Sequence, residues 1–327
     1  MTTLRGAIRS YGAAVRRIER EEQKQAREAA KRFKVQQKLQ EIEDVRQAVI
    51  DWEYYVNMIQ SVHKNCTDSI DWSKIKSTPR PKKPALESIH ENLAKDKLGY
   101  YKPTFFDKLF GSTERKIYLL KEEIEEAIII DQKEYDSAKK EYLAELNNWE
   151  ELQKISDGIK NKKHAAYLEA LEYFNPFSDV EELGAQLNFN FEGNLIDIEL
   201  KVNNEEVVPN YELKQTSTGK LSKKNMPKGK FNELYQDHIC SLAIRVAREV
   251  FAYLPIEKAR VNAMSSMLNT ITGHMEDQPI LSVIFIPETI GNLNLELIDP
   301  SDSMRNFIHN MKFNKTNGFS VVPIVEF

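Results

Sequence analysis

The sequence has few cysteines and no long apolar run. Its 327 residues include two cysteines, which cannot form the disulfide framework of a small secreted protein. No segment approaches the roughly 18 apolar residues of a transmembrane helix, and the N-terminus does not resemble a secretory signal. We therefore expect a cytoplasmic protein without an integral membrane segment. The three Trp, 13 Tyr and 15 Phe indicate a folded chain.

Glycine is scarce, and the prolines are unevenly distributed. Twelve glycines are about half of the usual 7% share, which favours long helices. Residues 1–175 contain 62 charged residues and have prolines only in a connector near 77–111, whereas residues 176–327 contain 34 charged residues with a net charge of −6. Because proline is excluded from helix interiors, the stretches 1–78 and 104–175 are free to form long helices. The change in composition predicts two domains, 1–175 and 176–327.

Apolar residues recur at alternating spacings of three and four in both proline-free stretches. One seam covers residues 42–59, and a second covers 117–159 with polar interruptions at Asp131 and Glu145. Such heptads are typical of coiled-coil packing, and the second seam predicts a helix over about 113–160. We expect a long N-terminal α-helical coiled-coil hairpin, with association of two chains through the same seams as the alternative.

The connector and the first residues have distinctive compositions. Residues 77–84 are basic and proline-rich, which indicates a stiff spacer before a short helix over 85–98. Four aromatic residues within 100–106 predict a small core that caps the coiled coil, or else a stacking platform. Residues 1–18 form a basic amphipathic pattern, which is consistent with a solvated helix, a membrane-surface helix or a nucleic-acid-binding arm.

From residue 186 onward the heptad pattern ends, and apolar residues instead recur at every second position. Alternation of this kind predicts strands with one buried face, and the intervening 3.6 period predicts a long helix. We expect an α+β domain with a mainly antiparallel sheet, built from a hairpin over 186–202, strands over 211–215, 260–264, 280–286, 293–297 and 320–325, and helices over 231–253 and 300–311.

Three charged residues in this domain suggest a catalytic site. Asp197 lies on the polar face of one predicted strand, and Glu212 and Lys214 share the polar face of the next. This acid, the following Glu-x-Lys, and the order of strands and helix resemble the core of PD-(D/E)xK nucleases. The resemblance implies that Asp197 and Glu212 bind Mg²⁺ and that Lys214 stabilises the attacking water. The simpler interpretation is the solvated face of a half-exposed sheet, where charged residues also alternate.

The segment after Lys214 has a strong local charge. No acidic residue occurs between Lys214 and Lys230. Such a concentration of positive charge predicts a site for phosphates or an acidic partner, with a solvated loop as the simpler interpretation. The lysines of the site are Lys220, Lys223, Lys224, Lys228 and Lys230, together with Lys214.

Other motifs give weaker signals. His63 and Cys66 form one His/Cys pair and His238 and Cys240 another, but their spacing does not predict a metal centre, and we expect none. Polar residues within 231–253 predict an internal ion-pair network or, alternatively, a phosphate site.

These patterns together favour an interaction protein. We expect a non-catalytic coiled-coil scaffold or interaction subunit of a bacterial cytoplasmic complex, without a cofactor. Its partner would be another protein or a second copy through the coiled coil, with nucleic acid as a further candidate. The layout looks similar to that of bacterial proteins that pair a coiled coil with a small C-terminal domain, some of which belong to mobile or anti-phage defence gene clusters. The alternative is a Mg²⁺-dependent nuclease that uses Asp197, Glu212 and Lys214.

Overall fold

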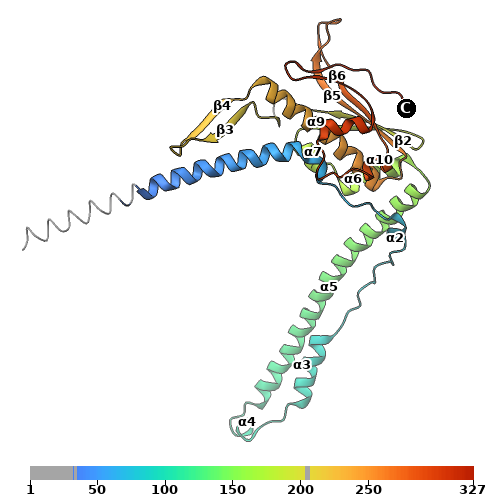
Figure 1. Cartoon of the computed structure of the whole chain (residues 1–327). Coiled ribbons are helices and arrows are strands. Elements are labelled where there is room, and N and C mark those ends of the chain that lie inside the picture. Colours follow the sequence, from blue (N-terminus) through green and yellow to red (C-terminus); the bar gives the residue numbers. More distant parts are fainter. Residues whose placement is uncertain (1–31, 33–34, 203–206) are drawn as a thin grey trace, which may run out of the picture. The chain divides into compact units, whose positions relative to one another are not determined.

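The computed structural model describes residue 32 and residues 35–202 and 207–327, so the basic segment 1–18 lies outside the described residues. The chain forms two compact units (Figure 1). The helical unit comprises Ser69–Asn175 with Tyr253–Pro255. The sheet unit comprises the remaining described residues. Residues 35–68 therefore belong to the sheet unit, whereas their composition groups them with the helices before residue 175.

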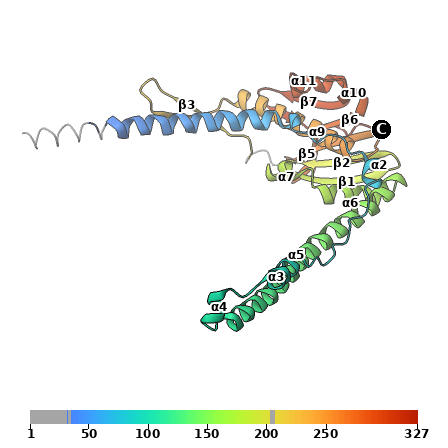
Figure 2. The same cartoon turned by 90° about the horizontal axis from the view of Figure 1, so that it is seen from below.

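The helical unit is built on α5 (Thr113–Lys160), the 48-residue helix that the heptad pattern predicts. At 1.5 Å per residue it is about 70 Å long. Three shorter helices lie along it (Figures 1 and 2), and α4 forms the turn between α3 and α5. They are α2 (Trp72–Lys76), α3 (Ile89–Tyr100) and α6 (His164–Phe174), with α4 at Phe105–Leu109.

The connector before α3 follows α5 as an extended chain. Trp149 Nε1 and Gln153 Nε2 on α5 donate hydrogen bonds to the backbone carbonyls of Thr78 and Ile75, at 2.9 and 3.0 Å. The bond from Trp149 gives a partner to a carbonyl at the start of the proline-rich segment, and the bond from Gln153 holds the last turn of α2 against α5. The base of the unit has an apolar core of Ile155, Ile159, Tyr167, Ala170 and Leu171, all buried.

The sheet unit contains a mixed six-stranded sheet in the order β1-β2-β5-β6-β7-β8. β2 and β5 are parallel, and the other neighbours are antiparallel. A parallel pair requires a crossover, which α9 (Lys228–Tyr253) provides here. The α+β class is confirmed, but the sheet is mixed. The strands are β1 (Gln186–Glu192), β2 (Leu195–Lys201), β5 (Lys258–Leu268), β6 (Met275–Phe285), β7 (Ile308–Asn314) and β8 (Gly318–Ser320).

The core of the sheet unit lies between β2, α9 and the helix over 35–60. Alternate residues of β2 are buried, and α9 is buried on all faces from His238 to Val250, where Arg248 alone is half-exposed. Ile59 at the end of helix 35–60 is fully buried, and its carbonyl oxygen lies 2.8 Å from Nδ1 of His238 on α9. The buried side chains are Ile196, Ile198 and Leu200 on β2 and Ile239, Leu242 and Val246 on α9.

Several short elements complete the sheet unit. Val62–Lys64 form the 3-10 helix η1, and Met304–Asn306 form η2. The α-helices α7 (Ser178–Glu182), α10 (Pro287–Gly291) and α11 (Pro300–Ser303) each have at most five residues. None of the described helices has the length and hydropathy of a membrane span.

Three elements near the C-terminus differ from the sequence prediction. The expected strand over 293–297 is a turn, because the N–H groups of Leu297 and Ile298 donate to the carbonyl of Asn294. The expected helix over 300–311 ends early, since β7 begins at Ile308 and pairs with β6. The chain after β8 adds no strand, but the Val325 N–H donates to Ser282 Oγ at 2.9 Å.

Candidate functional site

The lysine-rich segment forms a two-stranded antiparallel sheet rather than a loop. β3 (Tyr211–Gln215) pairs with β4 (Leu221–Asn225). Between them the chain turns at Gly219, whose φ of +81° favours glycine, and the Lys220 N–H donates to Thr216 Oγ1 at 3.0 Å. We call residues 211–230, which include the start of α9, the lysine ribbon.

Glu212 is the acidic residue of the lysine ribbon, and it pairs with two of the lysines. Its carboxylate accepts a hydrogen bond from Lys230 Nζ at 2.6 Å and lies 3.3 Å from Lys214 Nζ. The hydrogen bond from Lys230 is the main cause of a lowered Glu212 pKa. Lys224 lies directly opposite Glu212 in the ladder. The acid therefore offsets part of the charge on this face of the ribbon.

The remaining lysines differ in their surroundings. The Lys223 ammonium lies 3.8 Å from the centroid of the Tyr211 ring, a cation–π contact on the opposite face from Glu212. Lys220, Lys224 and Lys228 are exposed, and they form no ion pair with the part of the chain that the structure describes. These three cations are available to an anionic ligand.

The proposed nuclease residues are distributed over two sheets. Glu212 and Lys214 lie together on β3, as the Glu-x-Lys pattern requires. Asp197 lies on β2 of the six-stranded sheet, and its carboxylate accepts hydrogen bonds from Arg260 and Asn262 on β5, at 2.7 to 2.8 Å. The structure therefore gives Asp197 and Glu212 different partners in different sheets.

The four His and Cys residues all lie in the sheet unit, and each has a partner within the protein. His63 Nδ1 lies 2.8 Å from Ser241 Oγ, and the Cys66 thiol donates to the His63 carbonyl. Burial is the main cause of the lowered pKa of His238, about 4, and of the raised pKa of Cys66, about 11. Cys240 is fully buried. Neutral, paired side chains of this kind are structural.

Among the described residues, one group of three has the spacing of a metal site: His90, Asp131 and Glu134. The Asp131 carboxylate already accepts the backbone N–H groups of His90 and Glu91, at 3.0 and 2.9 Å. Burial would raise the Asp131 pKa, but these bonds outweigh it and lower the pKa. The polar interruption of the heptad seam is thus a cap, supplied by α5, for the N-terminus of α3.

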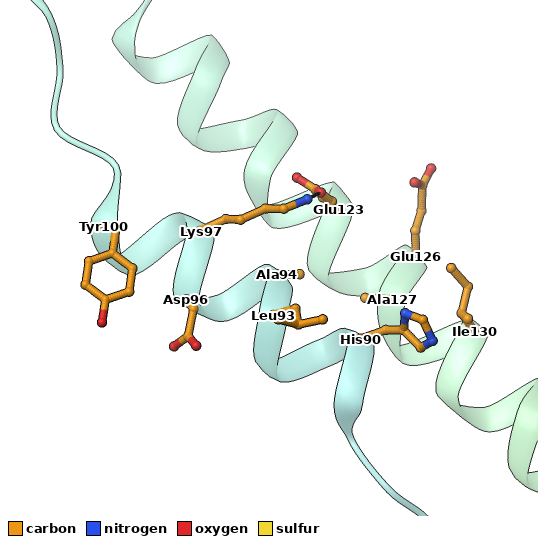
Figure 3. A pocket seen from close by; sticks show the side chains of 10 residues that line it. All are labelled: His90, Leu93, Ala94, Asp96, Lys97, Tyr100, Glu123, Glu126, Ala127 and Ile130. Carbon is orange, nitrogen blue, oxygen red and sulfur yellow. Dashed lines mark hydrogen bonds and ion pairs between the residues drawn. The ribbon is translucent and has the colours of Figure 1, made fainter.

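The groove between α3 and α5 has a thin apolar floor. Ala94 and Ala127 lie in the space between the two helices (Figure 3), and both are buried. Lys97 and Glu123 form an ion pair across the groove, which has a volume of about 680 Å³. Leu93 on the rim is 58% exposed. Two small residues allow close approach of the helices but bury little apolar surface.

Much larger apolar side chains are exposed elsewhere on these helices and on the turn between them. Half of the 28 large apolar side chains that are exposed among the described residues, 14 of them, lie between residues 86 and 143. We call residues 86–143 the helical arm. The most exposed aromatic residues of the arm are Tyr100, Phe105, Phe106, Phe110 and Tyr118, each more than 60% exposed. The described residues at this end of the helical arm therefore do not form the expected small aromatic core.

A buried acid organises the turn that carries these aromatic rings. The Asp107 carboxylate accepts hydrogen bonds from Lys116 Nζ at 2.5 Å, from Tyr101 Oη at 3.1 Å and from the Thr104 N–H at 3.0 Å. The bond from Lys116 is the main cause of the strongly lowered Asp107 pKa. These bonds hold the backbone of the turn and of α4 in place. The aromatic rings beside Asp107 are therefore exposed while the turn is folded.

The polar residues of α9 form a buried ion-pair network. Arg245 pairs with the fully buried Glu249 one turn later and with Asp179 on α7 at 3.2 Å. The Thr67 N–H donates to Glu249 Oε1 at 2.8 Å. The network thus joins three segments of the sheet unit, in accord with the expected internal ion pair.

Sequence reasoning missed the capping role of Asp131 and the strand β4. The break in the heptads at Asp131 was the available signal for the cap. Comparison with protein-family models, with curated proteins and with solved structures finds no match. Functional inference therefore rests on the two surfaces described above, the helical arm and the lysine ribbon.

Proposed function

We propose that this protein is a non-catalytic scaffold that self-associates through its helical arm. The proposal rests on a contrast within the arm between the small apolar contact that is buried and the large apolar side chains that are exposed. The contact between α3 and α5 buries two alanines, Ala94 and Ala127, whereas the large apolar residues beside them are exposed. Exposed apolar patches of this size mark interaction surfaces in folded proteins.

The exposed area is sufficient for a stable interface. A fully covered Phe or Tyr buries about 150–250 Å². The five aromatic residues of the arm, all more than 60% exposed, therefore contribute roughly 500–700 Å² of the ~800 Å² that each partner buries in a standard interface. Exposed Leu and Ile residues of α3 and α5 add apolar area to the same arm. The arm thus has the surface for a dimer contact.

The charge distribution favours a second copy of the chain as the occupant. Residues 95–121, at the closed end of the arm, contain seven basic and three acidic residues, a net charge of +4. The adjoining band, residues 87–91 and 122–136, contains nine acidic residues and one lysine, a net charge of −8. In an antiparallel pair of arms, each basic end would face the acidic band of the other copy, as a self-complementary two-fold interface requires.

Charged substitutions at the closed end test this proposal. The rings of Phe106 and Phe110 stack at 6.4 Å, and both side chains are exposed, so glutamate is tolerated at either position in the monomer. Burial of one Phe contributes roughly 1.5–3 kcal/mol, so Phe106→Glu/Phe110→Glu should weaken the dimer at least about a hundredfold. Size-exclusion chromatography with light scattering on the full chain measures this change.

The matched control uses equally exposed apolar residues of the sheet unit. Leu268 and Ile271 are 58% and 93% exposed near the turn between β5 and β6. Leu268→Glu/Ile271→Glu adds the same charge and should leave the oligomeric state unchanged. Equal dissociation of both double variants, with unchanged circular dichroism, would assign the effect to net charge and overturn the proposed interface.

A further inference from the structure

The lysine ribbon supports an inference that is independent of the helical arm. We infer that it binds the phosphate backbone of double-stranded nucleic acid without reading sequence. The ribbon contains six lysines and one acid, a net charge of +5, in a chain whose net charge is −4. All six lysines are exposed. A local field of this sign and density attracts polyanions.

The shape of the ribbon matches a duplex groove. Two antiparallel strands form a ladder of five residue pairs, and the major groove of B-DNA admits a two-stranded ribbon. The register places Lys214 and Lys224 on one face and Lys223 on the other. The face with Lys223 lies beside the helix over 35–60, since Gln215 Nε2 on that face donates to the Ile42 carbonyl at 2.9 Å, so the face with Lys214 and Lys224 is the one that can lie against the phosphates. The ribbon contains no arginine, the residue that most often reads guanine, so its contacts position rather than specify.

The composition of the ribbon favours nucleic acid over an acidic protein. Protein interfaces have an apolar, desolvated core. In the ribbon, Leu221, which is 45% exposed, is the large apolar side chain that stands out to solvent. The exposed surface is otherwise formed by lysines, hydroxyl groups and amides. A ligand held almost entirely by charge has the chemistry of a phosphate backbone.

Glu212 sets the strength of this site. Its ion pairs with Lys230 and Lys214 remove part of the positive charge from one face. Replacement by glutamine keeps the shape of the side chain, removes one negative charge and releases both ammonium groups. The variant Glu212→Gln should therefore bind a duplex several-fold more tightly than the natural chain. Under the nuclease interpretation, the same substitution would instead remove a Mg²⁺ ligand.

Fluorescence anisotropy on the full chain with a short mixed-sequence DNA duplex tests the inference over a range of KCl concentrations. The triple variant Lys220→Gln/Lys224→Gln/Lys228→Gln removes the three cations that form no ion pair with the described residues. It should lose more than tenfold in affinity, with a salt slope smaller by about 2–3, because each phosphate contact contributes ~0.9. The matched control Lys133→Gln/Lys139→Gln/Lys140→Gln changes three exposed lysines of α5 and should bind as the natural chain does.

Two results would overturn the inference. The first is equal binding by the natural chain and the ribbon triple variant. The second is absence of duplex binding together with lysine-dependent binding of a polyglutamate peptide, which would assign the ribbon to an acidic polypeptide. A Mg²⁺-dependent plasmid-nicking activity that Glu212→Gln and Lys214→Ala both abolish would establish the nuclease alternative. None of these outcomes depends on the oligomeric state of the helical arm.

Discussion

A single added methyl group at Gly158 tests the packing that supports the helical arm. Gly158 lies near the end of α5, where α6 crosses it, and a Cβ atom built there would lie 2.3 Å from the Ala166 Cβ. Ordinary contacts of this kind begin at 3.4 Å, so α6 must move by about 1 Å to accept alanine. The clash involves a Cβ atom that no side-chain rotation can displace.

The expected change in the free energy of unfolding has the opposite sign to the one that helix propensity alone would give. Gly→Ala within a helix normally stabilises by about 1 kcal/mol, whereas overpacking of a tight contact costs about 1–3 kcal/mol. We expect Gly158→Ala to destabilise the helical unit by up to ~2 kcal/mol. The double variant Gly158→Ala/Ala166→Gly moves the methyl group to the other helix and should recover much of this loss.

Hydrogen exchange of the full chain measures the effect locally. We expect faster amide exchange in α6 for Gly158→Ala, and partial restoration in the double variant. Amides of β5 and β6 in the sheet unit serve as the internal control. Slower exchange in α6, or a higher urea midpoint for Gly158→Ala, would refute the close packing of α5 and α6.

Two further predictions concern the sheet unit. Burial lowers the His238 pKa to about 4, so the side chain is neutral in the folded protein. Its contribution to the free energy of unfolding is therefore complete above pH ~6.5 and is lost as the pH falls towards 4, by roughly 3 kcal/mol in total. Urea unfolding of His238→Gln should therefore depend less on pH in this range than that of the natural chain or of the control His274→Gln, and parallel pH profiles would contradict this. Arg245→Met leaves the buried Glu249 carboxylate without its cation and should cost about 3–5 kcal/mol, whereas Arg245→Met/Glu249→Gln should cost clearly less because no charge remains buried. Equal urea midpoints for these two variants would exclude the ion pair as the cause.

Local patterns were sufficient to predict most of the longer regular elements. The heptads of residues 117–159 gave α5 nearly to the residue, since amphipathic periodicity is a local property. The β1–β2 hairpin was equally accessible, because its alternation is strict and Gly193 lies in the turn. β4 was missed because Leu221–Asn225 has no β-branched residue, and its pairing with β3 depends on the turn at Gly219.

Local sequence patterns did not predict which elements pack together in space. Residues 42–59 carry a heptad seam, yet the helix over 35–60 belongs to the sheet unit, with His238 beside the carbonyl of Ile59. The coiled coil between the two proline-free stretches therefore stays a prediction. Asp197 and Glu212 are on consecutive predicted strands. In the structure, however, β2 lies beside β5, which follows the α9 crossover, and β3 pairs with β4 in a separate sheet. The candidate site could be listed from sequence, whereas its partition between two sheets required the structure.

The mass of the natural chain in solution tests the central claim most directly. Sedimentation equilibrium of the full protein at low salt should give a reversible dimer of twice the 37.9 kDa chain mass. The dimer should dissociate in the Phe106→Glu/Phe110→Glu variant and persist in Leu268→Glu/Ile271→Glu. A mass of 37.9 kDa for the natural chain at every concentration would contradict self-association through the helical arm.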